Sequence, residues 1–78
     1  MDFKELEKLV ITGHDIEFEY DNSKYAIVKG PDGFHFSNIQ KQETLMIYSN
    51  ALQLLIKADI NGKKLNDISK DMKNIQVY

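Results

Sequence analysis

Residues 14–39 contain three stretches in which apolar and polar side chains alternate, separated by short turn sequences. The first stretch places Ile16, Phe18 and Tyr20 on one side and acidic residues on the other, the pattern of a half-buried strand. The next two stretches alternate in the same way, over residues 25–29 and 34–39. The two connections are rich in Asp, Asn, Pro and Gly, which favour tight turns. The pattern predicts three antiparallel strands in a meander.

A short helix is predicted before the meander, over residues 2–11. Phe3, Leu6, Leu9 and Val10 recur at the spacing of one helical face. Asp2 stands three residues before a glutamate, which is the spacing of a capping box at a helix N-terminus. Gly13 follows the helix and can adopt the left-handed conformation common at helix ends.

The segment after the meander predicts a strand followed by a helix. Residues 44–48 fit either a fourth strand or the entry to a helix. Asn50 is a good N-cap and has capping-box spacing to Gln53, which favours a strand that ends at Tyr48. The helix then begins at Ala51, and its predicted buried stripe consists of Leu52, Leu55 and Ile56.

The last segment predicts a turn, a second amphipathic helix and a final strand. Asn61-Gly62 marks the turn. Leu65, Ile68 and Met72 have helical spacing, and residues 74–78 form a short strand. The chain contains no linker or repeat, so residues 1–78 are expected to form one domain. The order α-β-β-β-(β)-α-α-β predicts an α+β fold, with an antiparallel sheet of three to five strands and two or three short helices on one face.

Composition restricts the class of protein further. The chain has 78 residues and no cysteine, which excludes disulfides, thiol catalysis and cysteine-ligated zinc. No apolar run approaches the roughly 18 residues needed to span a bilayer. The first five residues lack the basic-then-apolar order of a signal peptide. We therefore expect a cytoplasmic protein without a membrane partner.

No motif for catalysis or for metal binding stands out. The only histidines are His14 and His35, and a simple meander places a strand between them. Asp59-Ile60-Asn61-Gly62 resembles the start of a calcium loop, but its glycine stands at the fourth position instead of the sixth. Ser37 shares a strand face with His35, but neighbours on one face lie about 7 Å apart, too loosely placed for a catalytic dyad. The chain is therefore expected to be no enzyme and to need no metal or cofactor.

A nucleic-acid-binding surface is the alternative that the charges offer. The chain has a net charge of −2, with ten basic residues, all of them lysine. Without arginine, bidentate contacts to phosphate or guanine are not available. Five lysines gather in the C-terminal part of the chain, where three aspartates dilute them; they are Lys57, Lys63, Lys64, Lys70 and Lys73. Five aromatic rings on the predicted strands could stack on bases, but the core requires most of them.

The acidic side of the first strand is the most regular polar feature. Asp15, Glu17 and Glu19 project from the same strand face. Such a row could steer a basic protein partner, could protect an edge strand from aggregation, or could be only a solvated face.

The chain also resembles a group of small proteins. Residues 15–20, residues 24–27 and the Gly33-Phe34 turn are similar to segments of small uncharacterised single-domain proteins of low-GC Gram-positive bacteria and their phages or mobile elements. The helix, Asn-Gly-Lys turn and helix of residues 51–68 resemble the same proteins, so that the likeness covers most of residues 14–78. It implies a free-standing small α+β domain, and it assigns no catalytic residue.

These observations predict a non-enzymatic protein-interaction or regulatory domain that docks through Asp15, Glu17 and Glu19. The alternative is a weak nucleic-acid-binding protein that uses the C-terminal lysines. The apolar run Leu45–Ile47 leaves open a monomer or a weak homodimer.

Overall fold

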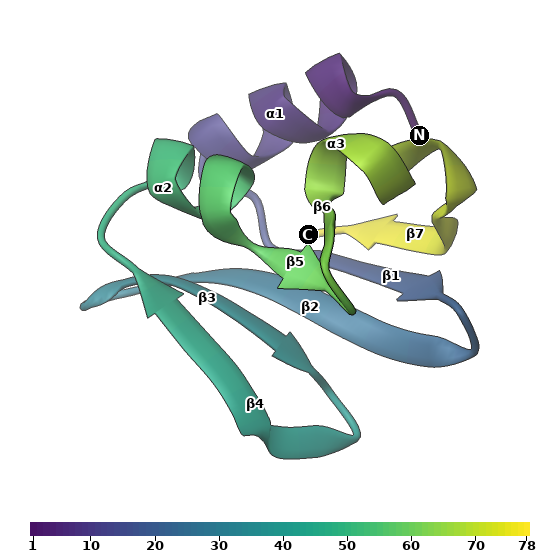
Figure 1. Cartoon of the computed structure of the whole chain (residues 1–78). Helices are drawn as coiled ribbons and strands as arrows, with labels where there is room; N and C mark the ends of the chain where they lie inside the picture. Colours follow the sequence, from purple (N-terminus) through teal and green to yellow (C-terminus); the bar gives the residue numbers. More distant parts are fainter.

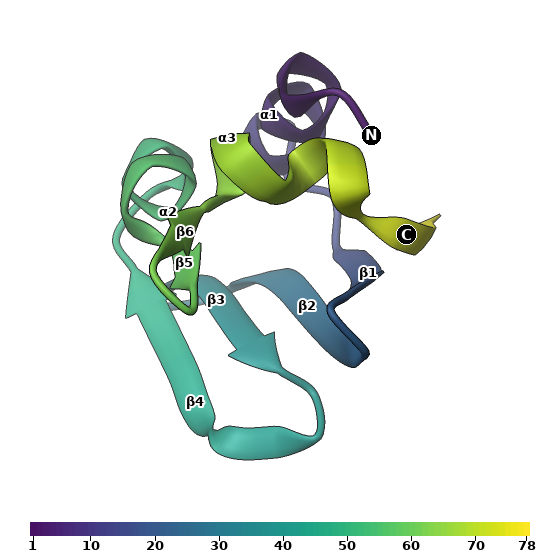
Figure 2. The same ribbon diagram turned by 45° about the vertical axis from the view of Figure 1, so that its right-hand side comes forward.

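A five-stranded antiparallel sheet carries the helices on one face and leaves the other face uncovered (Figures 1 and 2). The computed structural model describes residues 1–78. The sheet has the strand order β4-β3-β2-β1-β7, and β5 and β6 form a separate two-stranded hairpin. The elements are α1 (Phe3–Ile11), β1 (Ile16–Tyr20), β2 (Ser23–Gly30), β3 (Gly33–Asn38), β4 (Lys41–Tyr48), α2 (Ala51–Lys57), β5 (Asp59–Ile60), β6 (Lys63–Lys64), α3 (Leu65–Ile68), a 3₁₀ turn (Ser69–Asp71) and β7 (Lys73–Val77).

The predicted α+β class and the first helix are confirmed. Asp2 caps α1, because its carboxylate accepts a hydrogen bond from the backbone N–H of Lys4 at 3.1 Å. Leu6 and Val10 are fully buried against the sheet. Gly13 follows the helix with a φ of 87°, the left-handed conformation expected there. None of the helices is long and apolar enough to cross a membrane.

The meander is also confirmed, and backbone geometry explains its turns. Asp21 and Asn22 both have positive φ, as in the two-residue hairpin turns whose twist matches that of the strands. The second hairpin turns at residues 31–32, and Gly33 follows with a φ of 137°. A Cβ atom at Gly33 would overlap the backbone carbonyl of Tyr48. Glycine is therefore needed where β3 meets the end of β4.

Residues 44–48 form a strand, which decides between the two alternatives left open for them. β4 pairs with β3 from Tyr48 to Met46, and the register then shifts before Lys41. Asn50 caps α2 as predicted, since its side chain accepts a hydrogen bond from the Gln53 N–H at 2.9 Å.

The predicted buried stripe of α2 is wrong in two positions. Leu52 and Ile56 are 57% and 56% exposed, whereas Leu54 and Leu55 are buried. The spacing of Ala51, Leu54, Leu55 and Ala58 is as helical as that of the predicted stripe, and packing against α1 and α3 selects it.

The C-terminal region differs from the prediction in its local structure. The Asn61-Gly62 turn joins two short strands, β5 and β6, that were not expected. The predicted second helix is shortened to the four residues of α3 and the 3₁₀ turn. Its apolar residues nevertheless reach the core, because Leu65, Ile68 and Met72 are all buried.

Candidate functional site

The uncovered face of the sheet carries an apolar strip. The strand register places Val28 opposite His35 and His35 opposite Ile47, so that these three side chains form one row across β2, β3 and β4. Leu45 lies on the same face of β4, two residues from Ile47. Val28, Leu45 and Ile47 are all exposed. Because no helix lies on this side of the sheet, nothing in the chain covers them.

The acidic row of β1 lies on this same face. Asp15, Glu17 and Glu19 are half-buried, and the structure brings them together as the alternation predicts. β1 lies between β2 and β7, so the row is not at an edge of the sheet. The hypothesis that these acids protect an edge strand is therefore wrong, since the edges are β4 and β7.

The three carboxylates differ in their surroundings. Asp15 accepts a hydrogen bond from the backbone N–H of Lys29 at 3.2 Å, and Glu19 accepts one from the Asn74 side chain at 3.0 Å. Glu19 also lies between Lys24 and Lys73 in the strand register.

No charged residue lies opposite Glu17 on either neighbouring strand. Its neighbours across the strands are Ala26 and Gln76, and no side-chain hydrogen bond to Glu17 is present. Among the three acids, Glu17 is therefore the one whose carboxylate has neither a hydrogen-bond donor nor a basic residue opposite it.

The two histidines occupy separate places. Nε2 of His35 is 2.6 Å from a carboxylate oxygen of Asp32, and the two groups are hydrogen-bonded. This hydrogen bond lowers the pKa of Asp32 below its usual value. His14 Nδ1 lies 3.0 Å from the carbonyl oxygen of Tyr78 at the other end of the sheet. No three histidine, aspartate or glutamate side chains lie close enough to share a metal ion.

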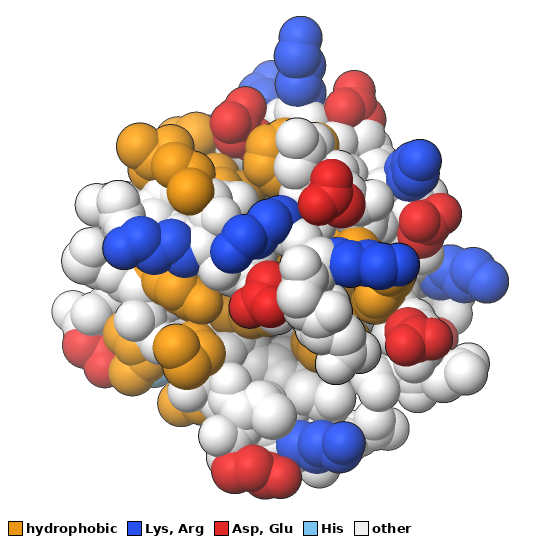
Figure 3. Space-filling view, in the orientation of Figure 1, with side chains coloured by type: hydrophobic (Ala, Val, Ile, Leu, Met, Phe, Trp, Pro, Cys, Tyr) orange, Lys and Arg blue, Asp and Glu red, His pale blue; other side chains and the backbone are white.

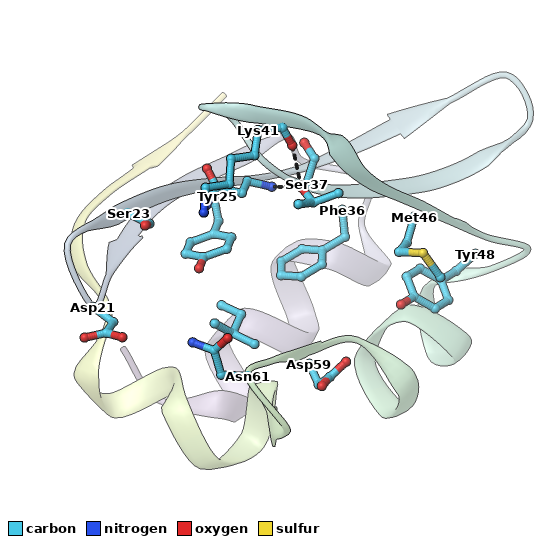
Figure 4. A pocket seen from close by; sticks show the side chains of 13 residues that line it. Asp21, Ser23, Tyr25, Phe36, Ser37, Lys41, Met46, Tyr48, Asp59 and Asn61 are labelled. Atoms are coloured by element: carbon cyan, nitrogen blue, oxygen red, sulfur yellow. Dashed lines mark hydrogen bonds between the residues drawn. The ribbon is translucent and has the colours of Figure 1, made fainter.

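A groove of about 370 Å³ opens on the helix-bearing side of the sheet, between β4 and the β5–β6 hairpin. Tyr25 and Phe36 form its floor and point toward the hairpin, and Met46 and Tyr48 line it from β4 (Figure 4). The floor continues a ring stack that begins in the core: Phe18, Tyr25 and Phe36 are stacked with centroid distances of 5.6 and 5.9 Å.

The groove carries more negative than positive charge. Asp21 and Asp59 line it, with Lys41 as the single basic residue, and none of the three forms a salt bridge. Asp59 uses one carboxylate oxygen to accept the Gly62 N–H at 3.0 Å. Burial, and then the negative charge of Asp59, raises the pKa of the Tyr48 phenol. The groove can thus accept a positively charged group above an apolar floor.

Sequence reasoning did not find this groove, because its residues come from separate turns and strands. The one signal in the sequence is the apolar run Leu45–Ile47, for which the sequence indicates only a role in dimerisation.

The five C-terminal lysines fall into two groups, with Lys57, Lys63 and Lys64 around β6, and Lys70 and Lys73 where the 3₁₀ turn leads into β7. Lys63 and Lys64 make up β6, and the Lys64 ammonium donates a hydrogen bond to the carbonyl of Lys57 at 3.3 Å. Lys73 begins β7 and lies beside Glu19. Figure 3 shows lysine and acidic side chains interleaved over the face that bears β5, β6 and α3. The arrangement is that of a mixed, solvated surface.

Comparisons with models of protein families, with curated proteins and with solved structures find no match to this chain.

Proposed function

We propose that the chain is a small non-enzymatic protein-interaction domain that binds a basic, amphipathic segment of a partner protein on the uncovered face of its sheet. The observation that carries the proposal is the composition of that face, which combines an exposed apolar strip with a row of carboxylates. Exposed apolar patches bordered by polar residues are typical of interaction sites, because covering them removes apolar surface from water.

The dimensions of the face fit one partner segment. β1 and β4 are separated by three strand spacings, about 14 Å. A helix with its side chains is about 10 to 12 Å across, so a helix that lies on the face could contact the apolar strip and Glu17 together. Apolar side chains of the partner would cover Val28, Leu45 and Ile47. Its basic side chains would face the carboxylates, which steer the encounter and set the orientation.

The position of the aromatic rings supports a protein partner over a nucleic acid. Tyr20, Tyr25, Phe34, Phe36 and Tyr48 all contact the core on the helix-bearing side. On the uncovered face only His35 and Tyr78 carry rings, and these are hydrogen-bonded to Asp32 and Gln76 at separate places, so the face has no continuous row of rings for stacking bases.

The test is an affinity pull-down with tagged chain from a lysate of a low-GC Gram-positive bacterium, with and without nuclease. The informative variant is Glu17→Lys, because Glu19→Lys would place three lysines side by side and strain the fold. Glu7→Lys is the matched control, since it makes the same charge change on α1. Thermal unfolding of each variant confirms that the fold is kept.

We expect one protein to be recovered by the wild-type chain and by Glu7→Lys, and to be lost with Glu17→Lys. Equal recovery by all three chains would contradict the proposal. Recovery that disappears with nuclease would instead assign the C-terminal lysines to nucleic acid, and its strong decrease with salt would support that reading.

A further inference from the structure

The outer edge of β4 is an unpaired strand edge without the usual protection. β4 is the last strand of the sheet, and its backbone groups on the side away from β3 have no partner strand. Edge strands are ordinarily blunted by charges, proline or irregular register. Lys41, Glu43 and the register shift protect the first half of β4 in this way. Residues 44–48 contain no charge and no proline.

The side chains of this second half are apolar and largely accessible. Leu45, Met46 and Ile47 are 41%, 54% and 48% exposed. They alternate between the two sides of the sheet, so Met46 and Tyr48 line the groove while Leu45 and Ile47 lie on the uncovered face. A strand added at β4 would alternate in the same way. Every second side chain of it would therefore be directed to the groove side.

The groove determines which side chain fits there. Phe36 and Met46 offer an apolar floor for an alkyl stem or a planar guanidinium. Asp59 and Asp21 have no cationic partner within salt-bridge distance. The one lysine of the groove, Lys41, belongs to the first half of β4. A positive side chain that enters beside Tyr48 would meet the Asp59 carboxylate.

We propose that the exposed edge of β4 binds an extended segment of another protein as a sixth strand, with an arginine or lysine side chain of that segment in the groove beside Asp59. The backbone hydrogen bonds supply the pairing, and the groove supplies the specificity, as in other cases of strand addition. The segment would alternate apolar residues on the uncovered face with polar or basic residues toward the groove. This site shares Leu45 and Ile47 with the apolar strip but does not include Glu17, and it does not depend on the proposed function.

A second copy of the chain is the competing occupant, and the charges disfavour it. Antiparallel pairing of two β4 strands about Met46 would place Leu45 opposite Ile47 of the other copy, an apolar match. The residues that this register directs to the groove side are Thr44, Met46 and Tyr48. None of them is positively charged, so the pairing would leave Asp59 and Asp21 without a cation.

The experiment uses isotope-labelled full-length chain and two synthetic peptides of about seven residues, an ordinary strand length. The first peptide alternates valine with threonine and has arginine at one threonine position. The second has citrulline in place of arginine, which keeps the shape and removes the charge. Amide chemical shifts of the chain are followed by NMR as each peptide is added. Sedimentation of the chain alone measures self-association.

We expect the arginine peptide to shift the amides of residues 44–48 and to bind about tenfold more tightly than the citrulline peptide, the usual scale of one charge-assisted hydrogen bond. Asp59→Asn should remove this difference, because the amide oxygen can still accept the Gly62 N–H while the charge is lost. Asp67→Asn is the matched control, since it removes one charge from an exposed position of α3. Met46→Lys should abolish binding of both peptides by protecting the edge.

Three results would overturn the inference. The first is the absence of shifts in β4 with the arginine peptide. The second is equal affinity for both peptides in the wild-type chain, which would remove the role of the groove. The third is a dimer of the chain alone that Met46→Lys dissociates, which would make a second copy the occupant. The Glu17→Lys variant should bind the arginine peptide normally, so that failure here and failure of the proposed function are distinguishable.

Discussion

β2 and β4 are both eight-residue strands of one sheet, and they differ in how far their apolar side chains are buried. β2 has a partner strand on each side, and Tyr25, Ala26 and Ile27 are buried. β4 has one partner strand, and Leu45, Met46 and Ile47 remain accessible. In β2 the apolar surface stabilises the fold. In β4 much of the same kind of surface is left in contact with water, where it can stabilise a complex instead.

The sharpest test of this comparison is a matched pair of isoleucine substitutions. Ile27→Ala in β2 removes a fully buried side chain and should lower the free energy of unfolding by about 4 kcal/mol. Ile47→Ala in β4 should change it by no more than about 0.5 kcal/mol, because the side chain is half exposed. Urea denaturation measures both. Ile27→Val, expected to cost about 1 kcal/mol, keeps the comparison measurable if the alanine variant does not fold. Similar losses at positions 27 and 47 would contradict the comparison, because they would show that Ile47 stabilises the fold as much as Ile27 does.

Gly33→Ala tests the attachment of β4 to the rest of the sheet. The positive φ and the overlap of a Cβ with the Tyr48 carbonyl predict a loss of about 2 kcal/mol and displacement of the end of β4. Gly62→Ala is the control, because Gly62 also has positive φ but no atom lies near its Cβ position. Amide hydrogen exchange should increase at β4 in Gly33→Ala and not in Gly62→Ala. Equal effects would mean that backbone conformation alone sets the cost.

Asn50→Ala tests the helix that follows β4. Loss of the hydrogen bond from Gln53 should cost about 1 kcal/mol, as is usual for an N-cap. Asn50→Asp is the conservative control and should retain most of the stability, because aspartate caps equally well. Thermal unfolding measures the stability of both variants. Equal destabilisation by Asn50→Ala and Asn50→Asp would show that the cap does not stabilise α2.

The sequence could predict the elements that local signals determine, but not the features that depend on packing between distant elements. The meander was predictable because alternation and turn residues are local signals, and Asp21, Asn22 and Gly33 adopt the conformations that these residues favour. The buried stripe of α2 was not predictable, because four of its seven residues are leucine or isoleucine, and two helical faces satisfy the same spacing. Packing against α1 and α3 selects Leu54 over Leu52.

Of the candidate sites, the acidic row could be predicted from the sequence and the groove could not. The acidic row could be predicted because one strand carries it, and alternation alone places Asp15, Glu17 and Glu19 on one face. The position of this row on an inner strand could not be predicted, because β7 pairs with β1 from the far end of the chain. The groove depends on the β5–β6 hairpin, whose two-residue strands give no periodic signal. The sequence around Asp59 predicts only a turn, and the fold is needed to bring Asp59 beside Tyr48.

The smallest expected effect concerns the inner end of β4, where Tyr48 is the least exposed residue of the strand. Burial raises its pKa above the ordinary value of 10.0, and the charge of Asp59 raises it further. Because the folded-state pKa is the higher one, stability is unaffected below about pH 10 and falls as the pH rises through the folded value. Asp59→Asn should lower the pKa of Tyr48 only in part, since burial is the larger cause. NMR titration of the Tyr48 ring carbons in the wild-type chain and in Asp59→Asn measures this shift. If Asp59→Asn leaves the pKa of Tyr48 unchanged, the carboxylate does not act across the groove, and a cation bound there would not be held by it.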